Sequence, residues 1–176
     1  MNYFFRSVSL LLFSSLSALA FAADREPYQI RAPLLLHILN YTTFTSNISS
    51  SFNLCFLEKG DYPHASMLLS SKISDKHVDN KLLNVIKINS IEQILLKQCQ
   101  AVFIAKESES ELLFSTLNTL ATDILFIGES NHFVEQGGMM AIVSIQSKMK
   151  IIVNKVQLEK SLLKISSRLL RLAKFI

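Results

Sequence analysis

Short, almost uninterrupted apolar runs recur along this chain, and their spacing limits the folds open to it more than any other feature. The runs lie at residues 53–57, 83–88, 101–105, 124–128 and 140–145. Several are rich in β-branched residues and apolar at nearly every position, which is typical of strands covered on both faces. Helix-like stretches lie between them, at residues 64–71, 90–97 and 108–120. This alternation predicts an α/β fold, a three-layer sandwich whose mostly parallel sheet has helices on both faces.

The last two strand-like runs predict a hairpin. Residues 140–146 and 149–154 are separated only by Ser147-Lys148. A parallel pair needs a long crossover connection, so two strands this close in sequence can pair only in the antiparallel sense. We therefore expect a mixed sheet with a hairpin near one edge.

Local signals mark the beginnings of two helices. Residues 25–44 space their apolar side chains to form one helical face, and Pro33 is expected near the beginning of this helix, where a missing N–H does least harm. Ser90 and Gln93 fit a capping box at the start of the stretch 90–97, with Ser90 as the cap.

The C-terminal residues 156–176 predict a long amphipathic helix. Its apolar side chains recur at steps of three and four, at Leu158, Leu162, Ile165, Leu169, Leu172 and Ile176. Lysine and arginine occupy other positions of the same stretch, so a helix lying on a membrane surface is one interpretation. Packing against the chain's own sheet is the commoner fate of such a stripe, and we favour it.

The same end of the chain is strongly basic. Residues 148–176 hold eight Lys or Arg and a single acid, Glu159, whereas residues 23–147 hold nine basic and thirteen acidic side chains. This asymmetry is compatible with an acidic partner, a nucleotide or a membrane surface. A solvated helix face explains it more simply, because Lys and Arg are the usual residues of such faces.

The first residues predict export. A short basic start with Arg6 is followed by an apolar and small-residue run, and Ala20-Phe21-Ala22 offers the small side chains that signal peptidase requires. The run contains serines and is shorter than the ~20 apolar residues of a membrane span, so an uncleaved anchor is disfavoured. We expect residues 1–22 to be a signal peptide cleaved after Ala22, and residues 23–176 to form a single domain.

Cys55 and Cys99 are the only cysteines of the chain. Their separation excludes a CxxC redox or zinc pair, and the four histidines are scattered, so no metal ligand set is indicated. In an oxidising compartment, two cysteines on apolar strand-like segments favour a structural disulfide over two buried free thiols.

Common catalytic signatures are absent. The sequence has no GxSxG, HExxH, P-loop or GxGxxG, so we expect neither an enzyme nor a bound cofactor, although dispersed catalytic residues would leave no such motif. Gly128-Glu129-Ser130-Asn131 follows a predicted strand and Gly137-Gly138 comes soon after, where α/β sheets gather ligands. Ordinary turns use the same residues, and we favour the turn interpretation, with His132 as a loop side chain.

The chain resembles the YfiR family of bacterial periplasmic proteins. The resemblance covers nearly all of residues 23–176, and its most specific parts are Leu54-Cys55-Phe56-Leu57, Cys99-Gln100-Ala101-Val102-Phe103-Ile104 and Leu163-Lys164-Ile165-Ser166-Ser167-Arg168-Leu169-Leu170-Arg171-Leu172-Ala173. Ile30-Arg31-Ala32, Leu125-Phe126-Ile127-Gly128, Gly137-Gly138-Met139 and Ile152-Val153-Asn154 also fit. Where the family tends to carry Trp-Pro after the first helix, this chain has Phe44-Thr45-Ser46, so any contact made by that tryptophan is missing.

The resemblance implies a function and a disulfide. Members of this family restrain an inner-membrane diguanylate cyclase by binding its periplasmic sensor region, which keeps cyclic-di-GMP and biofilm formation low. The family pattern also implies pairing of Cys55 with Cys99. Candidate partner-binding residues are Arg168 and Arg171 in the most family-like block, and Phe133 in the preceding loop, although helix solvation and core packing are their commoner roles.

Two other functions stay open at this point. One is a periplasmic sensor that binds a small ligand near Gly128–Gly138 and acts on a different signalling protein; the other is an enzyme with an uncatalogued site. The sequence leaves a small-molecule effector and a homodimer open, and it indicates no nucleic-acid partner.

Overall fold

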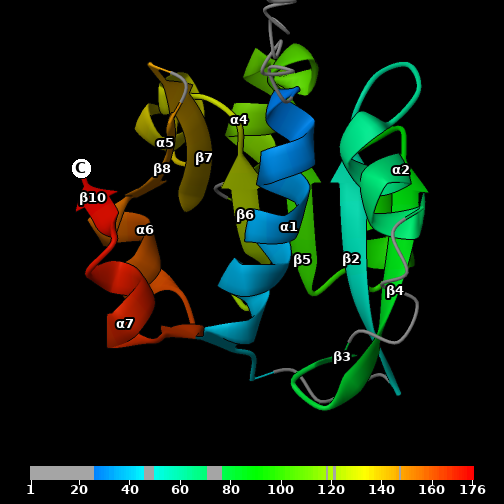
Figure 1. The fold of residues 1–176 in the computed structure, drawn as a ribbon, viewed down its shortest axis with the longest axis horizontal. Coiled ribbons are helices and arrows are strands. Elements are labelled where there is room, and N and C mark those ends of the chain that lie inside the picture. Colours follow the sequence, from blue (N-terminus) through cyan, green and yellow to red (C-terminus); the bar gives the residue numbers. More distant parts are fainter. Residues whose placement is uncertain (1–25, 46–49, 71–76, 118, 121, 147) are drawn as a thin grey trace, which may run out of the picture.

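A computed structural model describes residues 26–45, 50–70, 77–117, 119–120, 122–146 and 148–176. The predicted signal peptide, residues 1–22, lies outside these ranges. The described chain forms an eight-stranded sheet with helices on both faces, so the predicted three-layer α/β sandwich is confirmed (Figure 1). None of the helices within the described ranges has the length and apolar character needed to cross a membrane.

The sheet is mixed, as expected. Its strand order is β10-β8-β7-β6-β5-β2-β4-β3. The strands, in chain order, are β2 (Ser51–Leu57), β3 (His77–Val78), β4 (Lys81–Ile88), β5 (Ala101–Ile104), β6 (Leu125–Gly128), β7 (Met140–Ile145), β8 (Lys148–Val153) and β10 (Ala173–Phe175). Strands β4, β2, β5, β6 and β7 are parallel; β8 pairs with β7 antiparallel, which confirms the predicted hairpin, and β10 runs parallel to β8 at the edge.

Helices α1 (Pro27–Asn40) and α2 (Pro63–Ser70) cover one face of the sheet. Helices α3 (Gln93–Leu96), α4 (Glu111–Leu117) and α5 (Asn131–Glu135) cover the other, with the 3-10 turn η1 (Lys106–Ser108) before α4. The strand periodicity of two explains the two cores, because alternate side chains of β2 and β5 point to opposite faces.

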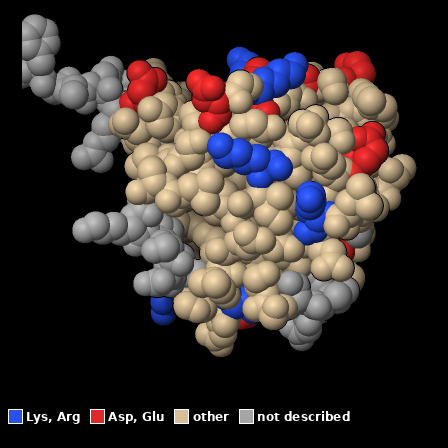
Figure 2. All heavy atoms as spheres, turned by 90° about the vertical axis from the view of Figure 1, so that its right-hand side faces the viewer, with Lys and Arg blue, Asp and Glu red and all other residues tan. Residues whose placement is uncertain are grey.

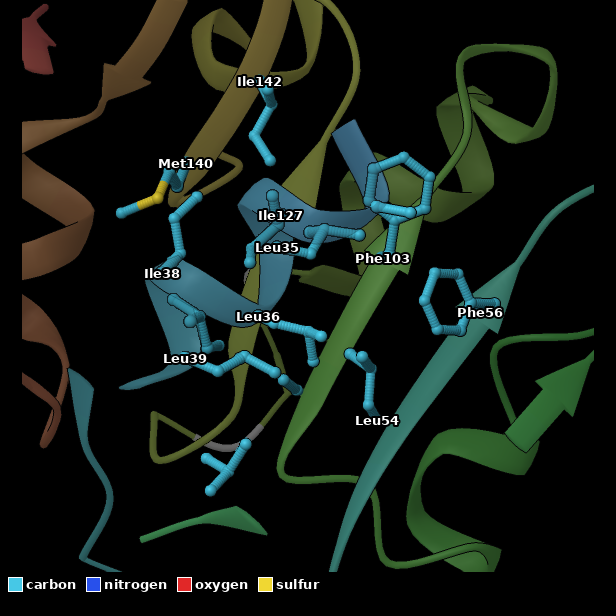
Figure 3. Close-up of a cluster of buried hydrophobic side chains, with 14 of the residues drawn as sticks. Leu35, Leu36, Ile38, Leu39, Leu54, Phe56, Phe103, Ile127, Met140 and Ile142 are labelled. Carbon is cyan, nitrogen blue, oxygen red and sulfur yellow. The ribbon is translucent and has the colours of Figure 1, made fainter. Parts of the chain in front are cut away.

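The larger core lies under α1. Five fully or almost fully buried side chains of this helix, Ala32, Leu35, Leu36, Ile38 and Leu39, pack on the sheet. They meet Leu54 and Phe56 of β2, Phe103 of β5 and Ile127 of β6 (Figure 3). Pro33 lies inside α1 rather than at its beginning, where Pro27 stands instead, and its side chain is exposed.

The predicted C-terminal helix over residues 156–176 is wrong. The chain there forms α6 (Lys155–Lys160), the short strand β9 (Lys164–Ile165), α7 (Ser167–Leu170) and β10. Extended backbone at Ser161 and Ser166 ends one helix and begins the next, and β9 pairs with β1 (Thr42–Thr43). These strand pairings satisfy backbone groups that a continuous helix would leave open along the edge of β8.

The capping box expected at Ser90 is also displaced. Helix α3 begins only at Gln93, and the Gln93 side chain accepts a hydrogen bond from the backbone N–H of Asn89 at 3.1 Å. The Ser90 hydroxyl instead hydrogen-bonds the Glu92 carboxylate and lowers its pKa. Helix α4 begins later than the predicted residue 108, because η1 and the extended backbone of Glu109 precede it.

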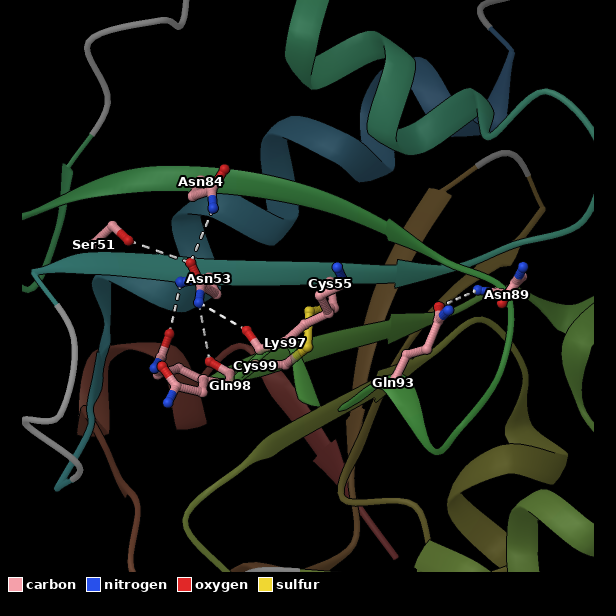
Figure 4. Close-up of a disulfide and its surroundings, with 10 residues drawn as sticks. Ser51, Asn53, Cys55, Asn84, Asn89, Gln93, Lys97, Gln98 and Cys99 are labelled. Carbon is pink, nitrogen blue, oxygen red and sulfur yellow. Dashed lines mark hydrogen bonds between the residues drawn. A yellow bond between two sulfur atoms is a disulfide. The ribbon is translucent and has the colours of Figure 1, made fainter. Parts of the chain in front are cut away.

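A disulfide joins Cys55, in the middle of β2, to Cys99, just before β5 (Figure 4). The two Cα atoms are 5.8 Å apart, and both side chains are buried in the core under α3 and α4. Nearby, the Asn53 side chain donates to the carbonyls of Lys97 at 2.9 Å and Gln98 at 3.2 Å. The turn that leads into β5 is therefore fastened to β2 by both covalent and polar contacts.

Replacing both cysteines by alanine should lower the free energy of unfolding by up to about 4 kcal/mol, because the bridge closes a long loop and restricts the unfolded chain. Chemical denaturation of the oxidised protein and the double variant measures this difference. Reductant should destabilise the parent protein and leave the variant unchanged. Equal sensitivity of both proteins to reductant would contradict a stabilising bridge.

Candidate functional site: a buried charge network and the adjoining crevice

Charged side chains converge at the carboxyl end of the parallel strands. Glu58 directly follows β2, and Glu129 directly follows β6. Arg31 comes from α1 and His64 from the first turn of α2. The side chains of Glu58, His64 and Arg31 are at most 4% exposed and that of Glu129 is 19% exposed, so this is a network inside the protein.

The guanidinium of Arg31 lies at the centre of the network. Its Nη1 donates to a carboxylate oxygen of Glu129 and to Nε2 of His64, the latter at 3.0 Å. Its Nε donates to the backbone carbonyl of Ile142 in β7 at 3.0 Å. Burial lowers the pKa of Arg31, and the adjacent carboxylate of Glu129 opposes this shift.

These contacts determine the tautomer of His64. A guanidinium can only donate, so Nε2 of His64 must accept, and the ring hydrogen lies on Nδ1. That Nδ1–H faces a carboxylate oxygen of Glu58. Glu58 also accepts from the backbone N–H groups of His64 and Ala65, each at 3.3 Å, and so holds the first turn of α2.

The network continues to the strand-end loops. The second carboxylate oxygen of Glu129 accepts from the backbone N–H of Lys106 in η1 at 3.0 Å. Beside it, the Ser130 hydroxyl lies 2.6 Å from a carboxylate oxygen of Glu109 and accepts from the N–H of Phe133, which caps α5. Burial raises the pKa of Glu109, and the hydrogen bond from Ser130 acts in the opposite direction.

The Phe133 ring packs against Gly128 and Gly138, two of the glycines noted in the sequence. Its side chain is fully buried, and a methyl group at Gly128 or Gly138 would overlap the ring. The segment 128–138 is therefore a packed turn followed by the short helix α5, so the predicted turn after β6 is confirmed, whereas the loop position predicted for His132 is wrong because His132 lies on α5. The Phe133 side chain has no solvent-exposed area, so the prediction that it contacts a partner is wrong. His132 is exposed and its ring meets Phe114 edge-on.

A crevice of about 530 Å³ lies next to Glu58, between the loops that follow β2, β4 and β5. The chain reverses direction across the sheet here, because β4 lies on one side of β2 and β5 on the other. Open α/β sheets bind ligands at such switch points. The walls include Ile91, Leu112, Tyr62 and Lys59, and the Ser108 hydroxyl is buried there without a hydrogen-bond partner among the described residues.

Within the described ranges, no three His, Cys, Asp or Glu side chains gather in a way that would hold a metal ion. Hydrogen bonds join Glu58 to His64 and His64 to Arg31, and others join these side chains to Glu129 and to backbone groups. This arrangement can fix the relative positions of α1, α2 and the sheet, and the adjoining crevice has the volume to admit a small molecule.

A family model described as YfiR/HmsC-like matches residues 28–174. The chain belongs to the YfiR/HmsC-like family. This match contains every residue of the charge network, both cysteines and the crevice.

Solved structures similar to this family member are distant in sequence. A conserved domain protein from Vibrio cholerae superposes with a TM-score of 0.55 at 13% identity, over 86% of this chain and 60% of that one. The ABC domain in complex with L-Trp from Streptococcus pneumonia gives a TM-score of 0.48 at 13% identity, over 85% of this chain and 60% of that one. The first likeness concerns the fold alone, and this chain spans only about 60% of both structures. No curated protein matches the chain significantly.

The predicted site residues of this YfiR/HmsC-like chain do not lie together. Arg168 and Arg171 are exposed on and just after α7, whereas Phe133 is buried beside β6. Sequence reasoning missed Arg31, Glu58, His64 and Glu129 as a group. Two signals were present: an arginine interrupts the apolar face of α1, and single acids follow two buried strands directly.

Replacing Arg31 by methionine should lower the free energy of unfolding by about 3–5 kcal/mol, because Glu58 and Glu129 would stay buried without their counter-charge. Urea denaturation measures the loss. Lys155→Met is the matched control, since Lys155 pairs with Glu159 at 3.8 Å while both side chains are more than 60% exposed. Its cost should stay below about 1 kcal/mol. Equal costs for the two variants would show that the network does not stabilise the fold.

Proposed function

We propose that this chain is an exported periplasmic regulator that represses an inner-membrane diguanylate cyclase by binding its periplasmic sensor region. The observation that carries the proposal is the YfiR/HmsC-like match over residues 28–174. Repression of this kind keeps cyclic-di-GMP and biofilm formation low. We further propose that residues 1–22 are removed on export and that residues 23–176 act as one domain.

Two features of the structure support this proposal. The disulfide between Cys55 and Cys99 suits an oxidising compartment such as the periplasm. The charged side chains at the carboxyl end of the sheet are buried and hydrogen-bonded to one another, so they favour a structural role over acid–base chemistry. A regulator without catalysis is the function that fits both.

Such a regulator works by binding the inactive state of the cyclase more tightly than the active state. The difference between the two affinities sets the shift in the cyclase population. A stiff domain transmits that preference well, because the charge network and the disulfide hold its layers in one arrangement.

Deletion of the gene should raise cellular cyclic-di-GMP, and the intact chain supplied in trans should restore the low level. Photocrosslinking from the exported protein should recover a membrane protein with a diguanylate cyclase domain. Unchanged cyclic-di-GMP together with no captured cyclase would overturn the proposed function. Mass spectrometry of the purified periplasmic protein should find Ala23 as its first residue.

Arg168 and Arg171 are our proposed partner contacts, because both are exposed in the most family-like part of the sequence. Arg168→Glu/Arg171→Glu should leave the melting temperature within a few degrees of the parent and weaken repression. Lys87→Glu/Lys97→Glu changes the same number of exposed charges elsewhere and should repress normally. Full repression by the arginine variant would remove these residues from the interface.

The crevice beside Glu58 favours a second function, a sensor that binds a small ligand and acts on another signalling protein. Its volume of about 530 Å³ and its place at the switch point of the sheet are the reasons to keep this candidate. A periplasmic metabolite extract should then raise the melting temperature of the parent protein and not that of Ser108→Phe, whose ring would occupy the crevice. No shift with either protein would count against the sensor.

A further inference from the structure

The sheet is only partly covered at its β10 edge. Helix α5 packs on β7 and β8 but is five residues long, so the outer part of the hairpin and β10 extend beyond it. A groove of about 310 Å³ remains there. Its walls include Asn131, Ile145, Lys150, Ile152, Leu172 and Lys174.

Strand register places three lysines on the same face as this groove. Lys148 lies opposite Ile145 in the antiparallel pairing of β8 with β7, and Lys174 lies beside Ile152 in the parallel pairing of β10 with β8. Side chains two residues apart on a strand share a face, so Lys148 and Lys150 point to the same side as Ile152. The lysine ammonium groups thus surround the aliphatic side chains of Ile145 and Ile152.

The groove combines exposed aliphatic surface with positive charge. Leu172 is 70% exposed and Ile145 is 43% exposed. Among the described residues, no acidic side chain lines the groove, and the single acid of residues 148–176, Glu159, pairs with Lys155 at 3.8 Å.

Other exposed aliphatic side chains, Leu95 and Leu96 on α3 and Leu112 on α4, lack this charge pattern. The neighbouring residues in sequence include Glu92 and Glu111, both exposed. Figure 2 shows the side of the molecule seen from the β3–β4 edge, where acidic and basic side chains are mixed. Among the described residues, the β10 edge is therefore the surface best matched to a negatively charged, partly apolar partner.

We propose that this lysine-bordered groove docks the protein on an anionic phospholipid surface. The lysine stems would lie along the acyl boundary with their ammonium groups at the phosphate level, while Leu172 and Ile145 enter the headgroup layer. Each lysine near such a surface adds electrostatic attraction, and salt weakens it. Docking would hold the regulator on the membrane that contains its proposed partner. This proposal does not depend on cyclase binding, because the vesicles that test it contain no other protein.

Co-sedimentation of the purified mature chain with vesicles tests the charge requirement. The chain should bind phosphatidylglycerol/phosphatidylcholine vesicles at low salt, bind pure phosphatidylcholine vesicles weakly, and dissociate as salt rises. Lys150→Gln/Lys174→Gln should lower the partition coefficient by about tenfold or more. The charge-matched control Lys87→Gln/Lys97→Gln, at exposed positions outside both the groove and the crevice, should bind within about twofold of the parent.

The aliphatic requirement has its own matched pair. Leu172→Ser should weaken binding by about fivefold, since it removes the apolar surface that enters the headgroup layer. Leu96→Ser, at a residue that is 78% exposed on α3, should bind as the parent does. Circular dichroism spectra and melting temperatures of all four variants confirm that the compared proteins are folded.

Three outcomes would overturn the proposal. The first is absence of binding to phosphatidylglycerol vesicles at low salt. The second is loss of binding in the control variants as large as in the groove variants. The third is tight binding of a polyglutamate peptide without binding of vesicles, which would assign the groove to an acidic protein segment instead of a membrane.

Discussion

The buried guanidinium of Arg31 is the constraint on which the arrangement of this domain depends. A charge in the interior must be paired and hydrogen-bonded, and Arg31 meets this requirement by contacting Glu129, His64 and a carbonyl of β7. Helices α1 and α2 can therefore pack on the sheet only where these groups coincide. Apolar packing under α1 supplies most of the favourable burial, whereas the charge network connects α1 and α2 to the residues that follow β2 and β6 and to β7.

Different contacts hold β2 and β5 together at their amino ends. There the Asn53 backbone N–H donates to the Gln100 side chain at 2.6 Å, and the Asn53 side chain bonds the turn before β5. The disulfide between Cys55 and Cys99 adds a covalent connection in the core on the far face of the sheet from α1. The central strands β2 and β5 are thus fixed at both ends, which suits a protein whose proposed task is to present a constant surface to a partner.

The surface divides into regions of different character. The carboxyl end of the sheet offers a crevice beside a neutralised charge network, and the β10 edge offers aliphatic side chains among lysines. Residues 148–176 carry eight basic side chains, and the structure spreads them over α6, α7, the residue after α7 and three strands. The proposed partner contacts, Arg168 and Arg171, and the proposed membrane-docking groove both lie outside the crevice.

The sequence by itself determined strands β2, β4, β5, β6, β7 and β8, the antiparallel hairpin and the α/β class, because these follow from local periodicity and from a loop too short for any other connection. It also favoured a disulfide, since two cysteines on apolar, strand-like segments have few alternatives in a chain that is predicted to be exported. The fate of residues 156–176 was decided by tertiary structure, because an apolar spacing that suits a helix was overridden by pairing with β1 and β8. The charge network was likewise beyond sequence reasoning: Arg31 and Glu129 are 98 residues apart, and only the packing of α1 across β6 brings them together. The position of Phe133 was also beyond sequence reasoning. A phenylalanine after a strand can face solvent or fill the space beside two glycines, and local sequence does not specify the neighbours that decide between these positions.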